Sequence, residues 1–271
     1  MTGALDLTVG IVGAGSMGSA IARGLVASGT LEAARVLVAD FDAEKRAALS
    51  ALGMRAFDGA EALLAEGPDV VVLAVKPQVL PGVMEQAAPH VRGRLAISIA
   101  AGVPLSALED AMPGVRVVRV MPNLPVQVRS GATALTAGSL ATPEDVELAR
   151  GLFSALGSVA AMREDQLDVA GAVVGTAPAF FSLFVDELTR AAVLRGLPAA
   201  DARSMVEATM RGCAEQLLNE GVHPREYMER VTSPGGTTAA ALRELEPALA
   251  EGTFAAVDAA LARTRELAGD R

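Results

Sequence analysis

Residues Val9–Ile21 read VGIVGAGSMGSAI. The apolar run Leu7–Val12 predicts a buried strand, and apolar residues at helical intervals after the glycines predict a helix. The glycines have the GxGxxG spacing found where a strand turns into a helix in dinucleotide-binding folds. Backbone N–H groups and the positive end of the helix dipole hold phosphates at such a turn. An ordinary glycine turn has the same spacing, but the flanking strand and helix favour dinucleotide binding.

Five residues of this turn are candidate cofactor contacts. By the usual roles of the three glycines, Gly13 permits the tight turn, Gly15 lets the backbone approach a pyrophosphate, and Gly18 allows close packing of helix on strand. Ser16 and Met17 lie between the last two glycines and complete the predicted phosphate site.

The chain up to residue 163 alternates between apolar runs and helical patterns. Strands are predicted at Leu7–Val12, Val36–Ala39, Asp69–Val75, Leu95–Ile99 and Val115–Val120, with edge strands at Ala132–Ala137 and Val159–Met162. Helices are predicted at Ala43–Leu52, Glu61–Ala65, between Gln78 and His90, and at Pro143–Leu156. This alternation predicts an α/β fold with a Rossmann-type doubly wound sheet, whose ligand lies at the carboxyl ends of the strands.

After about Glu164 no further strand is predicted. Helices are expected at Ala179–Arg195, Pro198–Asn219, Arg225–Val231, Thr238–Ala250 and Phe254–Ala268. The change predicts two domains, a dinucleotide-binding Rossmann domain at residues 1–163 and an all-helical domain at residues 164–271, which binds substrate and forms oligomers.

The segment Val169–Val185 has no charged residue and is mostly apolar. It is slightly short of the roughly 20 residues that a bilayer demands, and it contains Pro178. We expect a helix buried on all sides within the protein rather than a membrane span. Because this part of the helical domain is apolar on every face, we also expect burial against a second copy in a homo-oligomer.

Composition limits the classes of function. The net charge of −9 disfavours nucleic acid, whose phosphates such a surface repels. The single cysteine, Cys213, cannot form an internal disulfide, and no basic and apolar leader is recognisable, which together indicate a cytoplasmic protein. No group of His, Cys, Asp and Glu has metal-ligand spacing. We therefore predict no metal centre.

The choice of cofactor is predicted from Asp40, at the end of the second predicted strand. An acidic side chain there accepts hydrogen bonds from the adenosine ribose and repels the extra phosphate of NADPH. Lys45 and Arg46 follow closely and can soften that repulsion. We expect NAD(P)H to bind, with NADH favoured.

Two other strand ends carry candidate cofactor contacts. The first reads AVKP from Ala74, at the end of the strand Asp69–Val75, and the second reads MPNLP from Met121. The candidates are Ala74, Val75, Lys76, Pro77 and Asn123. A solvated loop charge at the lysine and a purely structural turn at the asparagine are the alternatives.

The loop Val231–Thr238 reads VTSPGGTT and joins two predicted helices. Glycines allow consecutive N–H groups to turn inward, and a helix beginning near the last threonine adds its positive dipole, so the loop suits a small carboxylate. The predicted substrate contacts are Ser233, Gly235, Gly236, Thr237 and Thr238. A plain helix–helix turn is the alternative, although it does not require so many hydroxyls. Nearby His223 is expected to be a helix cap rather than an acid.

These motifs together resemble the pyrroline-5-carboxylate reductase family over nearly the whole chain. The motifs GAGSMG, AVKPQ, SIAAGV, MPN, HP and VTSPGGTT occur in this order from residue 13 onward. The resemblance implies a Rossmann domain followed by a helical dimerisation domain, with dimers often assembled into a decameric ring. It also implies reduction of a cyclic imine to proline by NADPH or NADH.

One segment departs from the family pattern. The family usually reads SGSGPAY where this chain reads VGTAPAF, at Val174–Phe180. Thr176 keeps one of the family's hydroxyls and is the substrate contact that the resemblance implies there. Leu124 replaces the threonine that commonly follows Asn123. These changes concern the fit of the substrate rather than the fold.

A mechanism follows from the physical needs of hydride transfer. The substrate carboxylate bound in the loop sets its orientation, and the Thr238 hydroxyl, hydrogen-bonded to the imine nitrogen, helps keep that nitrogen protonated. Thr238 is thus the predicted catalytic residue, and the proton itself comes with the substrate or from water. A related imine reductase, a 2-hydroxyacid-type dehydrogenase and a non-catalytic dinucleotide-binding protein are the alternatives. Hydroxyacid dehydrogenases rely on a lysine early in the helical domain, and this chain has no lysine after Lys76.

Overall fold

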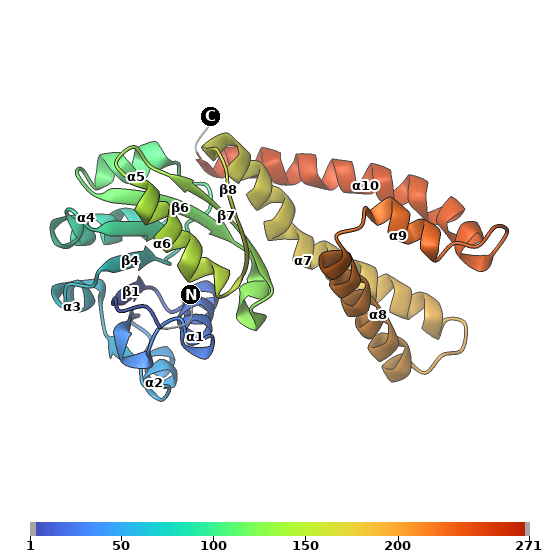
Figure 1. Cartoon of the computed structure of the whole chain (residues 1–271), viewed down its shortest axis with the longest axis horizontal. Coiled ribbons are helices and arrows are strands. Elements are labelled where there is room, and N and C mark those ends of the chain that lie inside the picture. The colour runs from blue at the N-terminus through green and yellow to red at the C-terminus, as the bar shows by residue number, and fades with distance from the viewer. Residues whose placement is uncertain (1–3, 269–271) are drawn as a thin grey trace. The chain divides into compact units, whose positions relative to one another are not determined.

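The computed structural model in Figure 1 describes residues 4–268, with side chains as far as residue 266. The chain divides into two compact units. One comprises the described residues up to Gly175 together with those from Leu261 onward, and the other comprises Thr176–Ala260. The predicted boundary between residues 163 and 164 stays a prediction.

The first unit holds an eight-stranded sheet. Its strands are β1 (Val9–Val12), β2 (Val36–Ala39), β3 (Arg55–Phe57), β4 (Val70–Leu73), β5 (Leu95–Ser98), β6 (Arg116–Pro122), β7 (Gly131–Ala137) and β8 (Gly157–Ala161). They lie in the order β3-β2-β1-β4-β5-β6-β7-β8, with β6 and β7 antiparallel and the other neighbours parallel. The order of the first six strands is that of a doubly wound dinucleotide-binding fold. The predicted Rossmann-type sheet is therefore confirmed.

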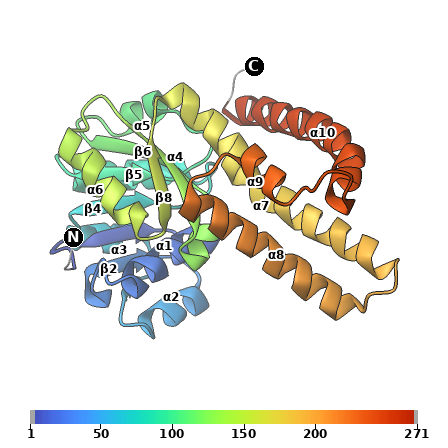
Figure 2. The same cartoon turned by 45° about the vertical axis from the view of Figure 1, so that its right-hand side comes forward.

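Helices cover both faces of this sheet (Figures 1 and 2). They are α1 (Ser16–Ala27), α2 (Ala43–Ser50), α3 (Ala60–Ala65), α4 (Leu80–Val91), α5 (Leu105–Ala111) and α6 (Pro143–Ser154), with short 3-10 helices at Ala33–Arg35 and Leu124–Val128. Because successive side chains of a strand point to opposite faces, β4 contributes to two cores. Its Val70 and Val72 join the core formed with α1 and α6, while Val71 and Leu73 join the core formed with α3, α4 and α5.

The second unit is helical. It contains the later part of α7 (Glu164–Val193), then α8 (Ala199–Glu220), α9 (Pro224–Arg230) and most of α10 (Thr237–Ala268). Helix α9 lies beside α10, and Arg225 Nη2 forms an ion pair with Glu246 Oε1 at 2.6 Å (Figures 1 and 2). No strand occurs after Ala161 in the described chain, as the sequence predicts.

Three sequence predictions about elements are corrected. The edge strand β3 was not expected, because three residues including Arg55 form no apolar run. The helices predicted at Thr238–Ala250 and Phe254–Ala268 are one helix, α10, since Gly252 does not interrupt it. Helix α7 begins at Glu164 rather than at Ala179 and continues through Pro178.

The expectation that Val169–Val185 is buried on all sides is wrong for the single chain. Helix α7 is long and apolar enough to cross a membrane by length and composition, with a mean hydropathy of 1.6 over its most apolar window, but only 11% of that window is buried. Phe181 and Leu183 are 59% and 61% exposed. Periodicity indicates an apolar helix, but it does not show whether the helix is covered by its own chain.

Candidate active site

The glycine turn between β1 and α1 is fixed by close backbone packing. Gly13 has φ of 103° and donates its N–H to the Ala39 carbonyl at 2.8 Å. A Cβ at Gly18 would lie 1.9 Å from the Gly13 carbonyl oxygen, so α1 can approach β1 this closely only with glycine at that position. A Cβ at Gly15 would meet no heavy atom within 4 Å. The fold therefore requires Gly13 and Gly18, whereas Gly15 faces open space.

A groove of about 370 Å³ lies at the carboxyl ends of β1, β2 and β4. The predicted cofactor contacts that line it are Gly13, Gly15, Asp40, Ala74, Val75 and Lys76. The other predicted contacts, Ser16, Met17, Gly18, Pro77 and Asn123, are not among its lining residues. Ser16 is exposed at the first position of α1, where the helix N-terminus presents its unpaired N–H groups. The groove has the position that the fold class assigns to a dinucleotide.

Asp40 is a structural part of the groove as well as a candidate ribose contact. Its Oδ2 accepts the Ala14 N–H at 2.8 Å, and its Oδ1 accepts the Asp42 N–H at 2.9 Å. The side chain is 17% exposed, so part of the carboxylate can still meet a ligand. The carboxylate thus ties the end of β2 to the glycine turn that follows β1.

The two basic residues after Asp40 have partners of their own. Lys45 Nζ lies 3.8 Å from Asp40 Oδ1 and 3.4 Å from Asp42 Oδ2. Arg46 Nη1 donates to the main-chain carbonyls of Asp40 at 2.8 Å and Phe41 at 2.9 Å. The pKa of the Asp42 carboxyl lies below its ordinary value, chiefly because the carboxylate accepts the Lys45 backbone N–H. The Lys45 side chain and the Glu44 backbone N–H lower it further. One nitrogen of the Arg46 guanidinium, Nη1, is thus paired with the backbone.

Asn123 is 8% exposed, and its amide is used inside the fold. Its Oδ1 accepts the Ala132 N–H at 2.9 Å, and its Nδ2 donates to the Val174 carbonyl at 3.1 Å. Four residues after Val174 in α7, Pro178 has no N–H with which to close the helical hydrogen bond to that carbonyl. The asparagine therefore supplies the donor that the proline lacks. A contact between Asn123 and a cofactor stays a prediction.

A charge cluster around the buried Arg119, at the start of α7, was not predicted from the sequence. Arg119 of β6 is 3% exposed and forms ion pairs with Glu164 Oε1 at 2.9 Å and Asp168 Oδ1 at 2.6 Å. Glu164 Oε1 also accepts the Leu105 N–H at 2.6 Å. An arginine inside the apolar run of β6 is the only sequence signal for this cluster. These contacts fix the first turn of α7 against the sheet.

The loop Val231–Thr238 belongs to the second unit. Gly235 has φ of 69°, and Gly236 donates its N–H to the Ser233 carbonyl at 3.0 Å. Helix α10 begins immediately afterwards at Thr237. Among the described residues, the hydroxyls of Ser233, Thr237 and Thr238 form no hydrogen bond, so these groups are available to a ligand. Thr176 lies half-buried in α7.

Two other candidate groups, His223 and Cys213, make contacts within the helical unit. His223 caps α9, with its Nδ1 accepting the Arg225 N–H at 3.1 Å, as predicted. Cys213 is half-buried in α8, and the Tyr227 hydroxyl lies 3.6 Å from its Sγ. Within residues 4–268 no three His, Cys, Asp or Glu side chains are grouped so as to hold a metal ion.

The sheet order, the glycine turn and the groove define a dinucleotide-binding protein of the Rossmann class. Residues 164–267 match the family model described as pyrroline-5-carboxylate reductase dimerisation, and residues 8–102 match one described as NADP oxidoreductase, coenzyme F420-dependent. The pyrroline-5-carboxylate reductase of Methanosarcina acetivorans is 36% identical over 96% of this chain and 97% of its own length.

Solved structures agree with this relationship. A pyrroline-5-carboxylate reductase from Coxiella burnetii has a TM-score of 0.91 at 33% identity, covering 97% of this chain and 99% of that one. A Plasmodium falciparum pyrroline carboxylate reductase with NADP bound has a TM-score of 0.87 at 26% identity, covering 98% of this chain and 100% of that one. The chain belongs to the pyrroline-5-carboxylate reductase family. It is an oxidoreductase that acts on a cyclic imine.

Proposed function

We propose that this protein reduces 1-pyrroline-5-carboxylate to L-proline with a reduced nicotinamide dinucleotide bound in the groove at the carboxyl ends of β1, β2 and β4. The observation that carries the proposal is that two independent ligand-binding features occur in one chain of this family. One is the glycine turn beside Asp40, and the other is the hydroxyl-rich loop Val231–Thr238. A dinucleotide and a small imino acid need separate binding features of these two kinds.

The residues of the chain have distinct roles in this proposal. The N–H groups at the start of α1 bind the pyrophosphate, and the Asp40 carboxylate accepts from the adenosine ribose. The Gly235 N–H and the unpaired N–H groups at the start of α10 bind the substrate carboxylate, which fixes the imine carbon for attack. The Thr238 hydroxyl oxygen accepts from the N–H of the protonated imine and so favours that form. The bound cofactor supplies the hydride, and the nitrogen keeps its proton in the amine product.

The assay of this proposal follows the absorbance of the reduced nicotinamide. Purified protein is expected to oxidise NADH or NADPH when 1-pyrroline-5-carboxylate is supplied, and to leave both unchanged without it. Loss of absorbance without any imino acid, or its absence with 1-pyrroline-5-carboxylate when the cofactor binds, would contradict the proposed reaction.

NADH is the proposed preferred cofactor. By its place at the end of β2, the Asp40 carboxylate would meet the additional phosphate of NADPH. Lys45 Nζ already lies 3.4 Å and 3.8 Å from the carboxylates of Asp42 and Asp40, and Arg46 Nη1 donates to two backbone carbonyls. At a partly exposed carboxylate the repulsion is worth about 1 kcal/mol, so we expect kcat/KM for NADH to exceed that for NADPH about fivefold.

Asp40→Asn is expected to reduce this preference to about unity, since it removes the charge and keeps the shape and one acceptor for the Ala14 N–H. Asp40→Ser should move the preference further towards NADPH. The measurement is kcat/KM with each cofactor, together with Tm for both variants. A strong NADPH preference in the unmutated protein would show that Lys45 and Arg46, not Asp40, set the choice.

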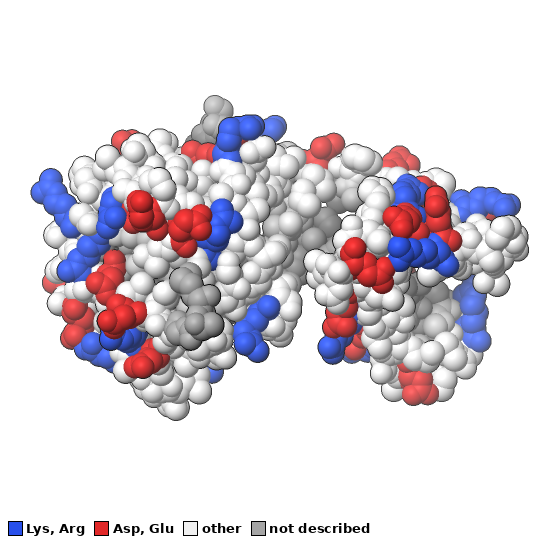
Figure 3. All heavy atoms as spheres, viewed as in Figure 1, with Lys and Arg blue, Asp and Glu red and all other residues white. Residues whose placement is uncertain are grey.

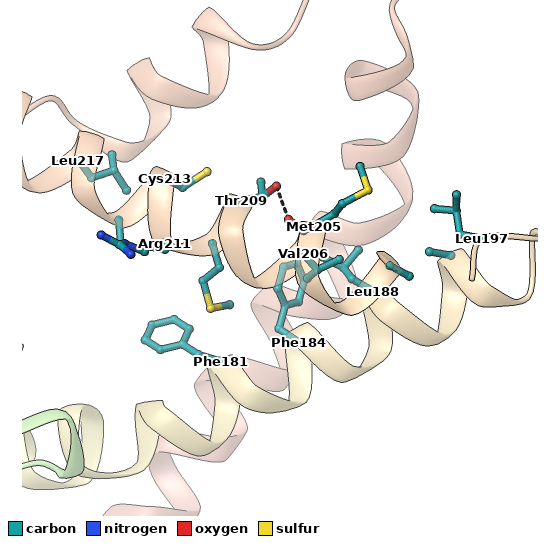
Figure 4. A pocket seen from close by; sticks show the side chains of 14 residues that line it. Phe181, Phe184, Leu188, Leu197, Met205, Val206, Thr209, Arg211, Cys213 and Leu217 are labelled. Atoms are coloured by element: carbon teal, nitrogen blue, oxygen red, sulfur yellow. Dashed lines mark hydrogen bonds between the residues drawn. The ribbon is translucent and has the colours of Figure 1, made fainter. Parts of the chain in front are cut away.

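A second copy of the chain is the proposed occupant of an apolar groove in the helical unit. The groove has a volume of about 760 Å³ and runs between α7 and α8, with Phe181, Phe184 and Leu188 facing Val206 and Leu217 (Figure 4). The dimerisation model of the family covers all of α7, α8 and α9 and nearly all of α10. Acidic and basic side chains are interspersed on the face shown in Figure 3 rather than separated by sign. Dimers are proposed, with a decameric ring as the larger assembly of the same dimers, in the cytoplasm.

Phe181→Asp is expected to convert the oligomer to single chains at micromolar concentration. Phe181 is 59% exposed in the single chain, so the change costs the fold little but places a charge in the buried interface. Light scattering after size-exclusion chromatography gives the mass. Leu140→Asp is the control, because Leu140 is 52% exposed and lies in the first unit. If Phe181→Asp keeps the wild-type mass, this groove is not the interface.

A further inference from the structure

Phe41 is the most exposed large apolar side chain in the described part of the protein, at 86%. It directly follows Asp40 and lines the groove at the carboxyl ends of β1, β2 and β4. A Cβ at Gly59 would lie 3.8 Å from Phe41 Cε1, so the ring stands beside a residue that has no side chain. An aromatic face left in water next to a ligand groove gains from any flat apolar group placed on it.

The backbone that carries this ring is held in place. Arg46 Nη1 donates to the carbonyls of both Asp40 and Phe41, at 2.8 Å and 2.9 Å. The Asp40 N–H donates to the Phe57 carbonyl at 3.2 Å. The side chain is thus exposed on a fixed main chain rather than on a loose loop.

The other apolar residues of the groove are aliphatic. Val79 is 51% exposed and Val83 is 9% exposed, and both belong to the groove lining. The lining therefore combines one aromatic face with aliphatic side chains and, one residue away from the ring, a carboxylate. That combination suits a planar heterocycle attached to a sugar whose hydroxyls donate to the carboxylate.

We propose that Phe41 is the stacking platform for the adenine ring of the dinucleotide. This inference rests on the proposed function, because that function places the cofactor in this groove. With the adenosine ribose on Asp40, the attached base lies next to the following residue of the chain. Stacking on Phe41 then supplies binding energy without hydrogen bonds to the base, and Asp40 selects the sugar.

The test is calorimetric titration of the full-length protein with ADP-ribose, which carries the adenine, its ribose and the pyrophosphate but cannot transfer hydride. Phe41→Ala is expected to raise Kd about tenfold, as loss of an aromatic face under a base generally does. Phe41→Tyr keeps the ring and should bind within about twofold of wild type. Leu140→Ala removes an exposed apolar side chain outside the groove and should leave Kd unchanged.

Steady-state kinetics separate a stacking role from a structural one. Phe41→Ala should raise KM for NADH and leave KM for reduced nicotinamide mononucleotide, which lacks adenosine, at its wild-type value. An equal rise for both, an unchanged Kd for ADP-ribose in Phe41→Ala, or no ADP-ribose binding by wild type would each overturn the proposal. If the expected pattern of ADP-ribose affinities occurs in a protein that does not reduce 1-pyrroline-5-carboxylate, the platform stands and the proposed reaction fails.

Discussion

Thr238→Ala is expected to lower kcat/KM for 1-pyrroline-5-carboxylate about 10- to 100-fold and to leave Tm at or slightly above the wild-type value. A hydrogen bond to a charged group is worth about 1.5–3 kcal/mol, and its loss at the protonated imine is felt in the transition state. The hydroxyl forms no hydrogen bond within the described chain, so its removal leaves no unpaired group behind. Alanine is also the better helix former at the second residue of α10. The measurements are initial rates against both substrates and thermal unfolding.

Two control variants separate chemistry from helix effects. Thr238→Ser restores a hydroxyl and should recover most of the activity. Thr253→Ala removes a hydroxyl from the same helix, one that donates to the Leu249 carbonyl at 2.7 Å, and should keep wild-type kinetics. A Thr238→Ala protein with wild-type kcat/KM would show that this hydroxyl has no part in the reaction.

The Rossmann half of the fold could be predicted because its signals are local. Each buried parallel strand is a continuous apolar run, and Gly13 and Gly18 are fixed by contacts within the β1–α1 turn and with the neighbouring β4 end. Strand β3 could not be predicted, because Arg55–Phe57 contains no continuous apolar run and is a strand only through its pairing with β2. The groove was predicted for the same reason as the sheet: parallel strands bring their carboxyl ends to one edge.

The start of α7 could not be predicted, because a distant residue decides it. Pro178 is ordinarily a reason to begin or break a helix, and the prediction began the helix at Ala179. In the structure the Val174 carbonyl receives no N–H from Pro178. It accepts a hydrogen bond from the side-chain amide of Asn123, 51 residues earlier. Arg119 likewise anchors Glu164 and Asp168 from a strand 45 and 49 residues away. Tertiary partners of this kind leave no periodic signal in the sequence.

Part of the candidate site was predicted from the sequence, and part was not. The acidic residue at the end of β2 and the lysine after β4 follow from position alone, and both line the groove. A ligand contact at Phe41 was not predicted, because a phenylalanine in a sequence is ordinarily a core residue. Only its exposure and its place in the groove suggest a ligand contact. The apolar α7 was correctly expected to be a helix, but its own chain buries only 11% of its most apolar window.

Gly15→Ala is expected to weaken cofactor binding about 10- to 100-fold while the protein keeps its wild-type Tm. The residue has φ of −66° and ψ of −173°, a conformation that alanine adopts without strain, and a Cβ there meets nothing within 4 Å. The open space is where a pyrophosphate would lie against the backbone, so the methyl group would hold it away from N–H groups whose charge-assisted bonds are worth about 1.5–3 kcal/mol each. Titration with NADH gives Kd, and thermal unfolding gives Tm.

Gly18→Ala is the matched control, and the opposite balance is expected. Its Cβ would lie 1.9 Å from the Gly13 carbonyl oxygen, so α1 must move away from β1, at a cost of about 1–3 kcal/mol and a fall in Tm of about 3–10 °C. The same methyl group is thus harmless to the fold at one glycine and damaging at the other. Wild-type affinity in Gly15→Ala would mean that the pyrophosphate does not lie against this turn. A fall in its Tm as large as that of Gly18→Ala would mean that the space beside Gly15 is already filled in the free protein.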